Sequence, residues 1–216
     1  MAFIITIAQR KGGAGKTTIA CHLAALLAKR GFRLAAIDLD DQKSFTTWAE
    51  RRKARLGELD FHLDENVRFS PGFRLRRLDG LADIVIIDTP PTLDSVISKT
   101  MRESNLVIAP LQLSPLDLDA SLPTAKMIGD ALAPGLFVIN RAPPRARIAD
   151  LIRSKMKELR LPIARTEIGS RAAFAESLAM GRIASEIEPS GLAAKEVEKL
   201  SDQIIELAKP RLKAVS

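Results

Sequence analysis

The chain has few residues of the kinds that build disulfides and metal centres: one cysteine, Cys21, and two histidines, His22 and His62, among 216 residues. A lone cysteine cannot close an internal disulfide, so no oxidising compartment is needed and we expect a cytoplasmic protein. These three residues also cannot form a four-thiolate metal site, and they offer little to a zinc site or a Ser-His-Asp triad. Secreted scaffolds, metal hydrolases and serine hydrolases are therefore disfavoured.

Long apolar runs are missing as well. The apolar segment at residues 3–8 is too short for a signal peptide or a membrane helix, and no later segment is long enough to span a bilayer. The length suits one domain over residues 1–216, and a hydrophobic content of 46% is sufficient for a folded core. We expect a single folded domain without a membrane span.

Positive charge is in excess and unevenly placed. The net charge is +7, and residues 141–216 contain 15 Lys and Arg against 10 Asp and Glu. Such asymmetry favours a polyanionic partner such as nucleic acid, although solvated surfaces often carry a similar surplus. Charge alone leaves both interpretations open.

Short β-branched apolar runs alternate with stretches of helical spacing, which predicts a doubly wound α/β fold: a mostly parallel sheet with helices on both faces. The charged residues 51–77 are interpreted as a helix end followed by an irregular or edge region, with a turn at Pro71 and Gly72. Pro210 is expected to end the last helix. The predicted strands are residues 3–8, 34–37, 84–87, 106–109 and 136–139, and the predicted helices are 17–29, 148–159 and 193–207.

A glycine-rich octet, Lys11 to Thr18, lies between the first strand and its helix, where a phosphate loop of a P-loop NTPase is placed. In such a loop, backbone N–H groups surround phosphate oxygens at a helix N-terminus. Lys16 is expected to hold the β- and γ-phosphates, and the Thr17 hydroxyl to bind Mg²⁺. A plain glycine turn with solvated lysines fits this context poorly. The other residues expected to contact ATP are Gly12, Gly13, Ala14, Gly15 and Thr18.

The octet resembles the signature of the deviant Walker A ATPases of the ParA/MinD family. Arg10 replaces the glycine of the generic loop, and Lys11 adds a second lysine. The resemblance implies an ATPase that dimerises with ATP between its subunits, in which Lys11 reaches the partner's phosphates. Otherwise Lys11 is a surface lysine beside the loop.

Three acids at the ends of predicted strands continue the resemblance. Asp38 and Asp40 match the family's first switch, in which Asp38 supports the Mg²⁺ shell and Asp40 orients the attacking water; Asp41 replaces the usual proline. Asp88 matches the Walker B acid, a Mg²⁺ ligand through water. Acids that follow a strand can also cap a helix, which is the main alternative for Asp41. Phosphoryl transfer requires such carboxylates near the metal and the attacking water.

Two further matches are weaker. Asn140 follows the last predicted strand, where the family's asparagine recognises adenine, although an asparagine here can simply form a turn. Residues 114–117 (Ser-Pro-Leu-Asp) resemble the small partition ATPases, which lack a DNA-reading helix-turn-helix extension. Since the first predicted strand starts at residue 3, we expect no such extension and no sequence-specific operator binding.

Residues 141–171 contain nine Arg and Lys against three acids, a surplus of +6. Phosphate contacts of this kind give salt-sensitive DNA binding without base recognition. A solvated helix face is the alternative, and the resemblance to partition ATPases favours DNA. The candidate contacts are Arg153, Lys157, Arg160 and Arg171.

The predicted function is an ATP-dependent switch on the nucleoid that positions a plasmid, a chromosome or a large protein cargo and is stimulated by an adaptor or centromere-binding protein. A MinD-like membrane switch is the weaker alternative, because the residues after Pro210 are few and lack an aromatic anchor. An iron-protein relative would need cluster cysteines, and a metabolic kinase would not need Lys11. The sequence identifies neither the cargo nor the adaptor.

Overall fold

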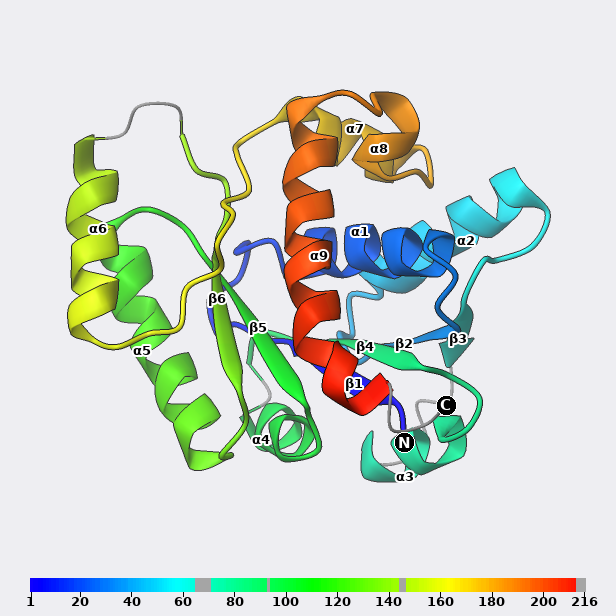
Figure 1. Ribbon diagram of the computed structural model, residues 1–216, viewed down its shortest axis with the longest axis horizontal. Helices are drawn as coiled ribbons and strands as arrows, with labels where there is room; N and C mark the ends of the chain where they lie inside the picture. The colour runs from blue at the N-terminus through cyan, green and yellow to red at the C-terminus, as the bar shows by residue number, and fades with distance from the viewer. Residues whose placement is uncertain (65–70, 93, 144–146, 213–216) are drawn as a thin grey trace.

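The computed structural model describes residues 1–64, 71–92, 94–143 and 147–212 (Figure 1). Its six strands form one sheet in the order β3-β2-β4-β1-β5-β6, and every neighbouring pair is parallel. The predicted α/β class and the parallel sheet are thus confirmed. The strands are β1 Phe3–Ile7, β2 Leu34–Asp38, β3 His62–Asp64, β4 Ile84–Asp88, β5 Leu106–Leu111 and β6 Gly135–Ile139.

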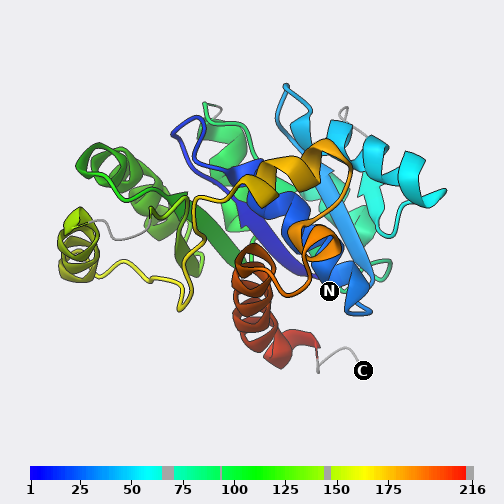
Figure 2. The same ribbon diagram turned by 90° about the horizontal axis from the view of Figure 1, so that it is seen from above.

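Helices cover both faces of this sheet (Figure 2). One face packs against α1, α2, α7, α8 and α9, and the other against α3, α4, α5 and α6. This is the doubly wound arrangement that alternating strands and helices predict. The helices in the described residues are α1 Lys16–Lys29, α2 Ser44–Leu56, α3 Pro71–Leu78, α4 Asp94–Arg102, α5 Pro115–Asp130, α6 Arg147–Glu158, α7 Ala172–Ala179, α8 Ala184–Ile187 and α9 Leu192–Leu212.

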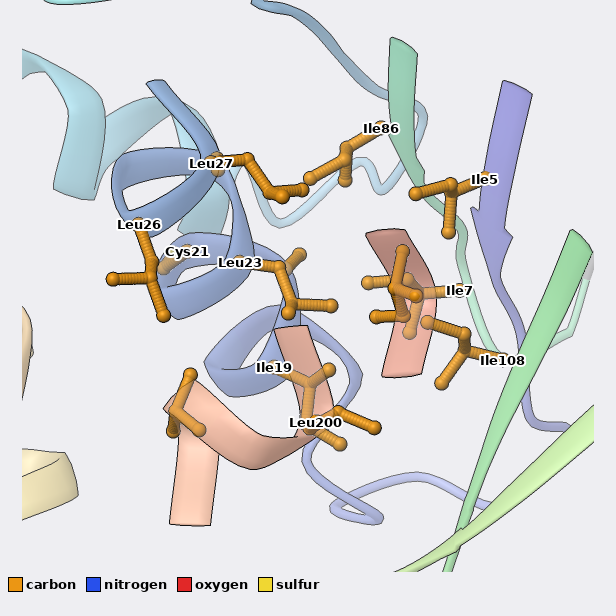
Figure 3. Packing of buried hydrophobic residues seen from close by; sticks show 14 of the residues in the cluster. Ile5, Ile7, Ile19, Cys21, Leu23, Leu26, Leu27, Ile86, Ile108 and Leu200 are labelled. Atoms are coloured by element: carbon orange, nitrogen blue, oxygen red, sulfur yellow. The ribbon is translucent and has the colours of Figure 1, made fainter. Parts of the chain in front are cut away.

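The largest cluster of buried side chains lies between the sheet and α1. Leu23 and Leu27 of α1 pack beside Ile5 of β1 and Ile86 of β4 (Figure 3). Leu200 of α9 belongs to the same cluster. All of these side chains are almost fully buried. Burying a side chain of this size contributes about 1.5–3 kcal/mol. The helix that follows the phosphate loop is therefore held rigidly against the centre of the sheet.

Two expectations about proline are wrong, and the strand predicted at residues 106–109 is longer than expected. Pro71 begins α3 instead of forming a turn, because a first-turn proline lacks only an N–H that has no helical partner. Pro110 lies within β5. The pairing of β5 with β1 ends at Ile108, so the N–H that proline lacks at position 110 is not needed for a hydrogen bond to β1. Pro210 does not end α9, which continues to Leu212. Because Pro210 lies close to the end of the helix, its missing N–H removes only one backbone hydrogen bond.

Candidate nucleotide-binding site

The phosphate loop connects β1 to α1 at the carboxyl edge of the sheet, where open parallel sheets bind ligands. Gly13 and Gly15 have φ angles of 73° and 94°, in the left-handed region that favours glycine. Gly15 is the N-cap of α1, so the free N–H groups of the first helical turn face the loop. This geometry suits an anion at the helix N-terminus.

Asn140 packs directly against this loop. Its buried side chain donates from Nδ2 to the carbonyl oxygen of Ala14 over 2.7 Å. A Cβ atom on Gly15 would lie 2.2 Å from the same Nδ2 atom. Gly15 is therefore required by a neighbour as well as by its own φ angle. The structure brings Asn140 to the nucleotide loop, while adenine recognition by its amide stays a prediction.

Lys16 is buried, and its Nζ donates to the Gln9 carbonyl oxygen over 3.1 Å. Burial lowers the pKa of this lysine, and the carboxylates of Asp88 and Asp40 oppose the shift. A cation held among backbone groups at the start of α1 is well placed to meet phosphate oxygens. Contact between Lys16 and the β- and γ-phosphates stays a prediction.

Thr17 and Asp88 form the centre of the candidate metal site. Thr17 Oγ1 donates to Asp88 Oδ2 over 2.6 Å, whereas Asp88 Oδ1 is buried without a hydrogen-bond partner. Burial raises the pKa of Asp88 to about 7; Asp38 adds to the shift, and the Thr17 hydrogen bond opposes it. A buried carboxylate oxygen with unused lone pairs suits a cation, so these residues fit Mg²⁺.

Mg²⁺ at a nucleotide site takes most of its ligands from water and phosphate oxygens. In the described part of the chain, no cluster of three or more His, Cys, Asp or Glu side chains is arranged to hold a metal by itself. Thr17 and Asp88 would therefore complete a shell that the nucleotide largely supplies. Bound there, Mg²⁺ would neutralise charge on the phosphates.

Asp38 anchors the first switch to α2. Its Oδ1 accepts from the Asp40 backbone N–H over 3.0 Å, and its Oδ2 accepts from the N–H and the hydroxyl of Thr46. Asp40 Oδ1 accepts from the N–H of Gln42, and Asp40 is only partly buried. The structure thus places both acids near Asp88. Their roles toward Mg²⁺ and the attacking water stay predictions.

Lys11 is turned toward α5. Its Nζ forms an ion pair with Asp117, whose side chain is 9% exposed, while Lys11 is 39% exposed. Asp117 is held in place by Ser114, the N-cap of α5, which donates from its hydroxyl to the carboxylate and accepts the Asp117 N–H. The sequence marked residues 114–117 only by resemblance, so this ion pair is a new finding.

Gln9 and Thr124 also hold the loop, and sequence analysis missed both. The buried Gln9 side chain donates to the Pro110 carbonyl oxygen over 3.1 Å and accepts from Thr124 Oγ1 over 2.8 Å. Thr124 in turn accepts the Arg10 N–H over 3.3 Å. Gln9 could have been recognised in the sequence, because it is a polar residue between an apolar strand and a glycine-rich loop.

The four candidate DNA contacts divide into two pairs. Arg153 on α6 forms a two-pronged ion pair with Glu167, and Arg171, at the N-cap of α7, forms one with Glu196. Lys157 and Arg160 are exposed and make no ion pair with any described residue. Arg145, counted in the basic stretch, lies outside the described residues.

Comparison with known proteins decides the family. Residues 5–183 match the CobQ/CobB/MinD/ParA nucleotide binding domain. The chain belongs to this family. It is also 30% identical over 215 residues to the maintenance of carboxysome distribution protein A of Halothiobacillus neapolitanus, covering 94% of this chain and 97% of that protein.

Solved structures of family members share the fold. The ATP complex of a Cyanothece McdA variant matches with a TM-score of 0.76 at 19% identity, covering 95% of this chain and 96% of that one. The septum site-determining protein MinD of Pyrococcus horikoshii, complexed with Mg-ADP, matches with a TM-score of 0.76 at 20% identity, covering 96% of this chain and 98% of that one. The family match over most of the chain makes this protein a nucleotide-binding ATPase.

Proposed function

We propose that this ParA/MinD-family ATPase is a switch that dimerises on ATP, binds DNA without sequence preference and positions a large cargo. The position of Lys11 carries this proposal. Lys16 is buried and bonded within the loop to the Gln9 carbonyl oxygen, whereas Lys11 is partly exposed and paired with Asp117 of α5. A second cation outside the loop's own phosphate contacts is available to the nucleotide of a second subunit.

ATP, unlike ADP, brings the γ-phosphate charge that such a lysine neutralises. Two subunits facing each other would each offer Lys11 to the other's nucleotide, so the dimer should form with ATP and dissociate after hydrolysis. Asp40 is the candidate for ordering the attacking water. An adaptor protein that accelerates this step would set how long the switch stays on.

The cargo is proposed from the relatives. A relative of nearly the same length is a maintenance of carboxysome distribution protein. A large cargo of the carboxysome kind therefore joins plasmids and chromosomes as a cargo class. The DNA matrix is supported by the net charge of +7 and by the exposed Lys157 and Arg160 at the end of α6. The protein would then act in the cytoplasm over the nucleoid.

The competing function is a MinD-like switch on a membrane surface, supported by the shared fold of Pyrococcus horikoshii MinD. Among the described helices, none is both long enough and apolar enough to cross a bilayer. A peripheral contact would instead need an amphipathic helix with bulky apolar anchors. The two functions differ in the surface that the ATP form binds.

One co-sedimentation experiment separates them. The protein is mixed with ATP and Mg²⁺, or with ADP and Mg²⁺, and offered either unrelated DNA duplexes on beads or vesicles containing anionic lipid. We expect the ATP form to bind all duplexes with similar affinity and not to bind the vesicles. Vesicle binding with ATP, together with no DNA binding, would replace the proposal by the MinD-like function.

A further inference from the structure

Two adjoining cavities lie at the amino edge of the sheet, opposite the phosphate loop. Their volumes are about 240 and 320 Å³, and both are lined by Ala2 and Asp79. The larger one is an open hollow bordered by the start of β1, by α3, by the end of α4 and by the end of α9, near the N label in Figure 1. No part of the nucleotide site lines either cavity.

Three arginines from three different helices line the larger cavity: Arg76 of α3, Arg102 of α4 and Arg211 of α9. None of them makes an ion pair with a described residue. By contrast, Arg33, which lines the smaller cavity, is held by two hydrogen bonds from its guanidinium to Asp83. The larger cavity thus gathers cationic groups whose donors the fold leaves unused.

The rest of the lining is apolar or already satisfied. Ile4 and Val85 contribute apolar side chains. Asn105 Oδ1 accepts the Ile4 N–H over 2.8 Å, and the Ser104 hydroxyl is bonded to Thr6 and Thr100. Asp79 pairs with the N-terminal ammonium group of Met1 over 3.4 Å, so Glu103 is the other carboxylate of the lining and balances only part of the arginine charge. The unused hydrogen-bond donors therefore belong mainly to the arginines.

We propose that this cavity binds a compact ligand with two or more anionic groups, phosphates or carboxylates, through Arg76, Arg102 and Arg211. A guanidinium presents several N–H donors in a planar fork that matches both kinds of anion. A concave site of this size encloses a small molecule, whereas duplex DNA spreads its phosphates over an open surface. The site lies at the other end of β1 and β4 from the phosphate loop and Asp88.

Amide chemical shifts of the ¹⁵N-labelled protein, titrated with inorganic pyrophosphate without metal or nucleotide, locate binding directly. We expect saturable shifts at Ile4, Ser104 and Asn105, separate from those at the phosphate loop, which report pyrophosphate held by Gly12–Thr17. Citrate, a carboxylate probe, should also shift the amide signals of Ile4, Ser104 and Asn105. The proposal would be overturned by shifts confined to the phosphate loop. It would also be overturned if Ile4 and Asn105 shifted with duplex DNA but with neither pyrophosphate nor citrate.

The variant Arg76→Ala/Arg102→Ala should weaken the Ile4 and Asn105 response by about tenfold or more, which corresponds to about 1.4 kcal/mol. Its phosphate-loop shifts should persist and serve as an internal control for folding. A matched variant, Arg51→Ala/Lys195→Ala, removes two exposed cations that do not line the cavity. Equal weakening in both variants would show a general charge effect and contradict the assigned site.

Discussion

Lys11 forms an ion pair with Asp117, 106 residues further along the chain in the first turn of α5. This pair links the phosphate loop to a helix on the opposite face of the sheet from α1. Moving Lys11 away to another anion would leave the nearly buried Asp117 carboxylate without its cation, which is costly. We therefore expect any displacement of Lys11 to be felt at the first turn of α5.

The contact between Gly15 and Asn140 predicts a position that tolerates no side chain. Gly15→Ala would place a methyl group 2.2 Å from Asn140 Nδ2 at a φ of 94°, so the loop must deform. We expect nucleotide affinity to fall by about tenfold or more. Calorimetric titration with ATP measures it. Gly129→Ala in α5, where the added methyl meets nothing within 4 Å, is the control and should bind like the wild type.

Lys16 and Asp40 should separate binding from turnover. Lys16→Ala removes the buried cation at the loop, so ATP binding itself should be lost. Asp40→Ala leaves the loop intact and should retain ATP while hydrolysis falls by roughly 10² or more, a typical contribution of one catalytic group. Binding and phosphate-release assays on both variants give the two readings. Wild-type turnover in Asp40→Ala would assign water positioning to another residue.

Burial of His22 predicts a pH dependence of stability. The ring lies between the Thr18 carbonyl oxygen and the Ala184 N–H, and burial lowers its pKa from 6.5 to about 4. Between these pH values the unfolded chain binds a proton that the folded chain excludes. Stability from this residue is therefore complete above pH 6.5 and is lost as pH falls toward 4.

Urea unfolding at several pH values between 7 and 5 measures this effect. Asp88, whose raised pKa makes the folded chain take up a proton in the same range, contributes the opposite slope. The test is therefore the difference between the two proteins: the stability of His22→Gln relative to the wild type should rise on acidification. His62→Gln provides the matched control, since His62 is exposed on β3 and its replacement should leave the slope unchanged. The same slope in His22→Gln as in the wild type would contradict the role of His22.

The fold and the local part of the site were predictable from the sequence. The phosphate loop is contiguous, and Asp38 and Asp88 end strands whose apolar character is plain, so both were expected at the carboxyl edge of the sheet. The structure adds that these two strands are neighbours, which pairs Asp38 with Asp88. The sequence did not predict the separate elements near residues 51–77. β3 is three residues long and α3 is eight, and both are too short to show a clear hydrophobic periodicity. Long-range contacts such as Lys11 with Asp117 depend on where α5 packs.

Charge counting shows the same limit. Residues 141–171 carry a surplus of +6, yet Arg153 is held by Glu167, and Arg171 by Glu196, which lies outside the counted stretch. Net charge along the chain does not reveal which cations are already paired in space. Lys157 and Arg160 are consequently the stronger candidates for phosphate contacts.

For DNA binding, we therefore expect Lys157→Glu/Arg160→Glu to weaken the ATP form strongly and equally on unrelated duplexes. Removing one cation that meets a phosphate should reduce the steepness of log affinity against log salt by about 0.9. Filter binding across a salt series measures the slope. Lys53→Glu/Lys195→Glu, with the same change in charge at exposed positions of α2 and α9, should retain more of the binding. Equal weakening by both variants would indicate attraction by net charge alone.

The nucleotide-dependent dimer is the central claim, and light scattering during size-exclusion chromatography tests it most directly. Wild-type protein should run as a monomer of 23.6 kDa with ADP and Mg²⁺ and as a dimer with ATP and Mg²⁺. Lys11→Ala should bind ATP and stay monomeric, while Lys53→Ala should dimerise like the wild type. A full ATP dimer in Lys11→Ala, or the same mass with ADP and with ATP in the wild type, would contradict the account.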